Sequence, residues 1–165
     1  MMTRDEIVSQ LQLLPHPEGG FYSEIYRGKQ VIPQAALGPE YNGDRNISTS
    51  IYFMLTRDSF SAFHKVTQDE AWHFYYGAPL TLHIVHPNGD LESIELGMNL
   101  SHGERPQFTV PGGSWFAAES HGEYTLVGCT VAPGFDFADF TLAHRQSLTE
   151  DFPQHAEIIE RFTRQ

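Results

Sequence analysis

Two periodicities divide the chain. Apolar residues recur at helical spacing along the first 14 residues, where Thr3 and Glu6 fit a capping box, and again over 152–162, where Pro153 suits a first turn. Between these ends the pattern is that of short strands rich in aromatic and β-branched residues, separated by turn signals. The expected strands are 21–27, 47–55, 60–66, 70–76, 80–86, 91–96, 106–110, 114–119, 124–132 and 137–143.

The punctuation between these segments predicts the fold class. "HPEGG" (16–20) is typical of a turn, and "HPNGDL" carries the Asn-Gly signal of a hairpin between 80–86 and 91–96. Residues 28–46 are expected to form a long loop. Helices are too few and too peripheral for a parallel α/β design, so we expect one all-β domain over 1–165, an antiparallel jelly-roll barrel with short N- and C-terminal helices.

Composition narrows the function classes. The formal net charge is −11 and no basic cluster occurs, which disfavours binding to nucleic acid or to an anionic membrane surface. No signal core or run of transmembrane length is present, so the sequence predicts a cytoplasmic protein. A single cysteine, Cys129, excludes an intramolecular disulfide and is expected to be a buried, inert thiol.

The stretch "HKVTQDEAWHFYYG" (64–77) carries the candidate chemistry. If 60–66 and 70–76 are paired antiparallel strands joined by a tight turn at "TQD", the alternation of side chains turns both His64 and Glu70 toward the barrel interior. His73 would then point to the opposite face, unless a bulge breaks the alternation. The sequence thus predicts a histidine and a carboxylate side by side.

Such a pair suits general acid–base chemistry near neutral pH, because a carboxylate raises the pKa of an imidazole and apolar burial lowers it. His64 could instead be a hydrogen-bonded barrel histidine without a chemical role. Glu70 is harder to dismiss, since an inward carboxylate is costly unless it has a partner. His73 is a reserve acid–base candidate, with a strand-face or subunit-interface position as its alternative.

Aromatic residues around this pair are candidates for core packing or for a wall against which a ligand stacks, and these are Trp72, Phe74 and Phe116. Tyr22, on the first strand, is a further candidate for ligand contact. Arg27 on the other face of that strand is either a surface residue or a partner for an anionic substrate group.

The same residues resemble a known family. His64, Glu70 and Gly77 fit the first cupin motif, and "VPGGSWF" (110–116) resembles the second. Four stretches, "PHPEGGFYSEIYR", "DEAWHFYYG", "VPGGSWFAAE" and "PGFDFADF", are similar in order to the small single-domain cupins called DUF985 or cupin-5, over nearly the whole chain. This resemblance implies a jelly-roll fold and a homodimer, but no agreed activity.

Departures from the cupin motifs bear on the cofactor. Val66 occupies the position of the second histidine of motif one, and Phe116 that of the motif-two histidine. Of four metal ligands in a metal-binding cupin, His64 and Glu70 remain. Two protein ligands hold a divalent ion weakly. The cofactor is therefore unknown, and a divalent metal is disfavoured.

Three hypotheses for function follow. Some cupins without metal isomerise or epimerise sugars with comparable histidine and acid residues, so the resemblance favours acid–base isomerisation or epimerisation of a small polar ligand, such as a carbohydrate derivative. One alternative is a non-catalytic binding or sensor module that uses the same pocket. The other is a metal-dependent cupin with a reduced ligand set.

Overall fold

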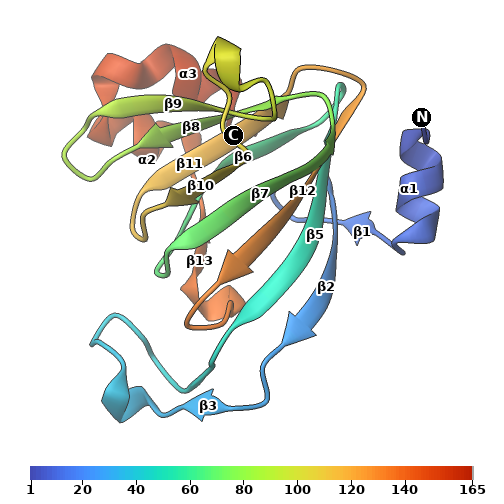
Figure 1. The fold of residues 1–165 in the computed structure, drawn as a ribbon. Helices are drawn as coiled ribbons and strands as arrows, with labels where there is room; N and C mark the ends of the chain where they lie inside the picture. Colours follow the sequence, from blue (N-terminus) through green and yellow to red (C-terminus); the bar gives the residue numbers. More distant parts are fainter. Residues whose placement is uncertain (165) are drawn as a thin grey trace.

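The computed structural model describes residues 1–164 and consists mainly of two antiparallel sheets that face each other (Figure 1). The six-stranded sheet has the order β1-β2-β5-β12-β7-β10 and the five-stranded sheet the order β13-β6-β11-β8-β9. Most neighbours in these sheets are not consecutive in the sequence, as in a jelly roll. The predicted all-β class, with antiparallel sheets and short terminal helices, is confirmed.

The strands are β1 (Leu14–Pro15), β2 (Phe21–Arg27), β3 (Val31–Ile32), β4 (Arg45–Asn46), β5 (Thr49–Thr56), β6 (Phe60–Val66), β7 (Glu70–Gly77), β8 (Leu80–Val85), β9 (Leu91–Leu96), β10 (Gln107–Val110), β11 (Trp115–Ser120), β12 (Tyr124–Val131) and β13 (Phe140–Leu142). The helices are α1 (Arg4–Gln10), α2 (Arg145–Asp151) and α3 (Ala156–Arg161), with 3₁₀ turns η1 (Gln34–Ala36), η2 (Leu100–His102), η3 (Phe137–Asp139) and η4 (Pro153–His155).

The terminal helices begin as the sequence predicts. Thr3 and Glu6 form the reciprocal capping box of α1, and Pro153 lies in the first turn of η4. The helices α2 and α3 lie against the five-stranded sheet (Figure 1), where Phe162 packs on Phe63. Across residues 1–164, no helix combines the length and the apolar character needed to span a bilayer.

Two expectations about local structure were wrong. Residues 28–46 are not a plain loop, because β3 and β4 pair as a small ribbon with η1 between them, and this lobe projects from the barrel (Figure 1). Residues 137–143 are not one strand, since η3 precedes the short β13. In η3 the Asp136 carboxylate accepts the N–H of Ala138, which favours a turn before the chain can extend.

The expected hairpin of 60–66 with 70–76 was also wrong. β6 pairs with β11 and β13, whereas β7 pairs with β12 and β10 in the other sheet. The intervening turn passes between the sheets, because Gln68 is buried and its amide donates to Gly134 O at 3.1 Å and to Asp139 Oδ2 at 2.7 Å. The hairpin at "HPNGDL" does form, between β8 and β9.

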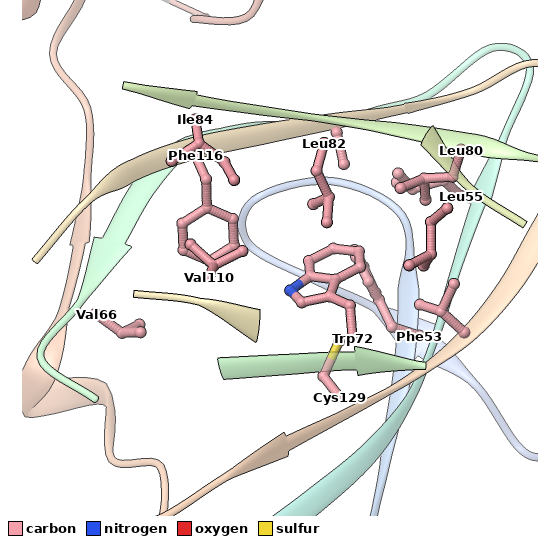
Figure 2. Packing of buried hydrophobic residues seen from close by; sticks show 13 residues of the cluster. Phe53, Leu55, Val66, Trp72, Leu80, Leu82, Ile84, Val110, Phe116 and Cys129 are labelled. Carbon is pink, nitrogen blue, oxygen red and sulfur yellow. The ribbon is translucent and has the colours of Figure 1, made fainter. Parts of the chain in front are cut away.

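The main core fills the space between the two sheets. Trp72 stands from β7 at its centre, in contact with Phe53 and Phe116 (Figure 2). Its indole is 1% exposed. Burial of each such aromatic side chain stabilises the fold by about 1.5–3 kcal/mol. These side chains fill one half of the barrel interior, and the polar groups lie in the other half.

Candidate active site

A cavity of about 400 Å³ occupies the polar half of the barrel. Its volume lies within the range of about 300–1,000 Å³ that is usual for small-molecule sites. Two carboxyl groups and two imidazoles line its buried part, and these belong to His16, Glu18, His64 and Glu70. Aromatic side chains from β2 and from the 135–140 segment complete the wall.

His64 reaches the cavity by the alternation of side chains along β6. Phe63 turns outward under the C-terminal helices, and His64 therefore turns inward, where it is 2% exposed. Phe116 contacts the His64 ring with centroids 4.1 Å apart, and Phe140 stacks on it at 5.4 Å. These rings hold the imidazole in one orientation.

Glu18 reaches the same cavity from the turn "HPEGG". Gly19 and Gly20 have φ of +114° and +77°, and a Cβ at either position would collide with the main-chain oxygen of Phe60 or of Met54. The turn is tied to β6, because the Ala62 N–H donates to Glu18 O at 2.8 Å. The two glycines thus allow the turn to pack closely against the sheets. The carboxylate of Glu18 then lies inside the cavity, and Glu18 is 5% exposed.

Glu18 and His64 form a buried pair in which Nε2 of His64 lies 2.7 Å from Oε2 of Glu18. Nδ1 of His64 lies 2.7 Å from the carbonyl oxygen of Ala62, and since a carbonyl only accepts, Nδ1 carries a proton. Burial opposes both charges, but the mutual attraction outweighs it, so the pKa of His64 is raised and the pKa of Glu18 is lowered. Both shifts favour the ionised form of the pair, an imidazolium beside a carboxylate.

Glu70, at the start of β7, lies on the same cavity wall and is half-buried. Its carboxyl forms no ion pair with any of residues 1–164. Burial and the nearby charge of Glu18 raise its pKa to about 7, and His64 offsets this rise in part. Near neutral pH this carboxyl therefore exists in both protonation states.

His16 is the fourth polar group and is neutral. Its Nδ1 accepts the Glu18 N–H at 3.1 Å, and burial lowers its pKa. The ring packs edge-on against Tyr22, with centroids 4.6 Å apart. His16 therefore supports the turn that carries Glu18 and offers Nε2–H as a neutral donor.

The structure brings some of the predicted ligand-contact residues to the cavity and leaves others in the core. Tyr22 and Arg27 line the cavity, whereas Trp72, Phe74 and Phe116 belong to the hydrophobic cluster behind it. Arg27 shares the cavity face with Tyr22, although simple alternation placed it on the opposite face, because β2 changes register between Glu24 and Tyr26.

His73 lies on the outer face of β7, away from Glu70. Its Nε2 lies 2.9 Å from Oγ1 of Thr130, and its ring stacks on Tyr75 with centroids 6.5 Å apart. β7 is regular between Glu70 and His73, so no bulge turns this histidine inward. His73 therefore has no access to the cavity groups.

The donor set does not fit a divalent metal. Both nitrogens of His64 are engaged, one by Ala62 O and the other by Glu18. Val66 and Phe116 present hydrocarbon where metal-binding cupins have histidines. Within the described part of the chain, no three His, Cys, Asp or Glu side chains converge as a metal site.

Sequence reasoning paired His64 with Glu70 and missed Glu18, which is the carboxylate that touches the imidazole. The available signal was an acid between a histidine and two glycines in "HPEGG", one of the four stretches shared with DUF985 cupins. Two consecutive glycines allow a turn to pack closely against neighbouring main chain, so the residue before them, Glu18, is a candidate for an inward side chain.

Comparisons with known proteins agree with the fold. Residues 5–143 match the family described as "Cupin superfamily (DUF985)". The chain is 32% identical, over 147 residues, to the uncharacterized protein YML079W of Saccharomyces cerevisiae, covering 82% of this chain and 73% of that protein.

Solved structures show the same architecture. Protein SO0799 from Shewanella oneidensis is 39% identical and superposes over 99% of both chains with a TM-score of 0.88. A hypothetical protein from Leishmania major is 34% identical with a TM-score of 0.91, over 99% of this chain and 100% of that one. Oxalate decarboxylase from Bacillus subtilis, 14% identical with a TM-score of 0.55 over 93% of this chain and 37% of that one, shares the fold alone.

Proposed function

The chain belongs to the DUF985 family of the cupin superfamily, and within that fold we propose an acid–base isomerase or epimerase that acts on a small polar molecule in the barrel cavity. One observation carries this proposal. Glu70 is a cavity-wall carboxyl without an ion-pair partner among residues 1–164, and its pKa of about 7 lies beside a buried His64–Glu18 pair. A group that is half-protonated at the working pH is suited to both halves of a proton transfer.

In the proposed reaction Glu70 is the catalytic residue. As a carboxylate it removes a proton from a carbon next to a substrate carbonyl, and the resulting carboxylic acid returns the proton to the neighbouring carbon. The electron pair of the broken C–H bond becomes the carbon–carbon double bond of an enediolate while the carbonyl π pair moves onto oxygen. The proton of the adjacent substrate hydroxyl passes to that oxygen. The double-bond pair then forms the new C–H bond as the deprotonated oxygen becomes the new carbonyl. No external oxidant or reductant is consumed.

Glu18 and His64 act as positioning residues in this scheme. The negative charge of Glu18 contributes to the raised pKa of Glu70, and His64 keeps Glu18 ionised by its contact at 2.7 Å. His64 was first expected to transfer protons with Glu70, but both of its nitrogens are engaged by the protein. Its proposed contribution is therefore electrostatic.

Deuterium exchange tests this function. The protein is incubated in D₂O with a panel of aldoses, ketoses and their amino-deoxy derivatives, and loss of C–H signals is followed by proton NMR. We expect catalysed exchange at one carbon, reduced about 10²–10⁴-fold by Glu70→Gln, the usual range for loss of a general base. Glu92→Gln, on exposed β9 where Glu92 pairs with His86, is the matched control and should exchange at the parent rate.

Two outcomes would overturn the enzymatic proposal. Exchange that survives Glu70→Gln would remove Glu70 from the mechanism. Compounds that raise the melting temperature without any exchange would instead support the non-catalytic binding module.

We also propose that the protein is a homodimer joined through the outer face of the six-stranded sheet. Tyr52, His73, Tyr75 and Thr130 form an uncharged patch there, in which Tyr75 is 50% exposed and packs edge-on against Tyr52. On a chain with net charge −11, an uncharged patch is where two copies approach with least repulsion. Light scattering should give twice the chain mass, and Tyr75→Glu should give a monomer; a monomeric parent would contradict the proposal.

A further inference from the structure

Phe135 and Phe137 form an aromatic corner at the mouth of the cavity. Their ring centroids are 4.9 Å apart with planes at 81°, and Phe140 packs against both. Phe137 is 51% exposed although it lines the cavity. A half-exposed phenylalanine that lines a cavity leaves part of its ring available for contact with a ligand.

Asp136 lies between these two phenylalanines in the chain and lines the same cavity. One oxygen, Oδ1, accepts the N–H of Ala138 at 2.8 Å, which fixes the carboxylate at the mouth. Asp136 is exposed, whereas Glu70 is half-buried and Glu18 is buried. The cavity mouth is therefore lined by one carboxylate and a packed pair of aromatic rings.

Arginines near this carboxylate are already paired. Arg27 donates from Nε and Nη2 to Glu24, from Nη1 to Asn46 Oδ1 at 2.9 Å, and from Nη2 to Phe135 O at 3.1 Å. Arg45 donates to both oxygens of Asp139, at 2.7 Å each. Each arginine charge is thus matched by a carboxylate other than Asp136, and the mouth keeps an unbalanced negative charge.

From this geometry we propose that the mouth, formed by Phe135, Asp136 and Phe137, is a subsite for an organic cation and selects ligands that carry an ammonium group. Aromatic faces attract cations through their quadrupole, by about 0.5–2 kcal/mol, and a carboxylate adds charge attraction. The inference rests on the proposed function in that both use one cavity. The ammonium end binds at the mouth and the reacting carbon lies at Glu70.

Anionic ligands are disfavoured by the same arrangement. Of the two alternatives for Arg27, the role as a partner for an anionic group is disfavoured, because its charge is matched by Glu24 and four of its five N–H groups donate to Glu24, Asn46 and Phe135 O. His64 is likewise neutralised by Glu18. A phosphate or carboxylate entering the cavity would meet the carboxyl groups of Asp136 and Glu70, while Arg27 and His64 are already paired with Glu24 and Glu18.

Three probes of one shape and different charge test the subsite. They are choline, its uncharged carbon isostere 3,3-dimethylbutan-1-ol, and 3,3-dimethylbutanoate, each titrated by NMR against the full-length protein. We expect choline to bind about tenfold more tightly than the alcohol, equivalent to about 1.4 kcal/mol, and the carboxylate to bind more weakly than either. Equal binding of choline and alcohol, preference for the carboxylate, or absence of choline binding at millimolar concentrations would overturn the proposal.

Asp136→Asn isolates the charge, because the amide oxygen can still accept the Ala138 N–H. It should reduce choline affinity nearly to that of the alcohol and leave the affinity for the alcohol unchanged. Asp90→Asn, in the β8–β9 turn and outside the cavity lining, makes the same change in net charge and should leave the choline preference intact. Loss of the preference in Asp90→Asn as well would show that net charge, not the mouth, attracts the cation.

This result is separable from the proposed reaction. Glu70→Gln should abolish deuterium exchange while the preference for choline over the alcohol persists. If exchange depends on Glu70 but the preference is absent, the subsite is wrong and the reaction stands. If the preference is present without exchange, the subsite stands and the reaction fails.

Discussion

Two buried ionic clusters lie in one barrel and differ in charge balance. In the first, Arg45 faces Asp139 through two hydrogen bonds of 2.7 Å, so one cation meets one carboxylate. In the second, His64 meets Glu18 at 2.7 Å while Glu70 is a second carboxyl on the same wall. In the balanced cluster each charge stabilises the other, so both groups stay ionised near neutral pH. In the unbalanced cluster, burial and the charge of Glu18 raise the pKa of Glu70 to about 7, and this difference separates a structural ion pair from candidate acid–base chemistry.

The largest expected effect comes from breaking the balanced cluster. Asp139→Ala would leave the Arg45 guanidinium buried without its carboxylate, and Arg45 is 5% exposed. We expect a loss of about 3–5 kcal/mol in the free energy of unfolding, measured by urea denaturation. Asp90→Ala, on the exposed β8–β9 turn, is the control. A loss as small as that of the control would show that this pair does not hold the 28–46 lobe to the barrel.

A double replacement sharpens this point. Arg45→Met together with Asp139→Leu removes both charges, so it should cost less than Asp139→Ala alone. If the double variant is the less stable one, hydrogen bonds of the pair, and not its charge balance, carry the stabilisation.

Glu70→Gln should act in the opposite direction. The folded-state pKa of about 7 lies above the ordinary value of 4.5, so the ionisable side chain favours folding below pH 4.5 and that contribution is lost as pH rises through 7. Replacing the ionisable carboxyl by an amide should raise the free energy of unfolding at pH 8 by about 3 kcal/mol. The free energy of unfolding at pH 4 should be nearly unchanged. Urea denaturation at both pH values checks this. A gain of equal size at both would point to packing instead.

Glu18→Gln sharpens the comparison within the second cluster. Without the Glu18 charge, burial is no longer outweighed and the pKa of His64 should fall. The pKa of Glu70 should fall as well, because the Glu18 charge raises it by more than the His64 charge lowers it. NMR titration of the His64 and Glu70 side chains measures both pKa shifts. We also expect Glu18→Gln to lower the free energy of unfolding by about 1–3 kcal/mol at neutral pH, because a buried hydrogen-bonded pair is weakened. An unchanged pKa of Glu70 would show that the charge of Glu18 does not act on this carboxyl and would contradict the account.

The smallest effect is expected at Arg27. Its pair with Glu24 is exposed, with side chains 38% and 41% accessible. Arg27→Ala should therefore change the free energy of unfolding by less than about 1 kcal/mol in chemical denaturation. A loss comparable to that of Asp139→Ala would erase the distinction between exposed and buried pairs.

Many of the strands and helices were predictable, because the residues that determine them are close together in the sequence. Alternation and turn residues predicted β6, β9 and the "HPNGDL" hairpin, and the helical stripe with Thr3 and Glu6 predicted α1. Strand pairing was less accessible, since "TQD" has the composition of a tight turn and yet connects two sheets through the buried Gln68.

The site was predictable in part for the same reason. Strand parity turned His64 and Glu70 inward, and both line the cavity. Glu18 lies in an irregular turn, where no period indicates direction, and its contact with His64 depends on how that turn docks on β6. Arg27 moved to the cavity face because of a register shift that alternation does not reveal.

The central claim is that Glu70 carries the unbalanced proton of the cavity. Carbon-13 NMR titration of protein labelled at glutamate side chains, with Glu70→Gln to assign the resonance, measures it directly. The account predicts a Glu70 carboxyl that titrates with a pKa of about 7. A carboxyl that titrates near 4.5, as an ordinary exposed glutamate does, would contradict it.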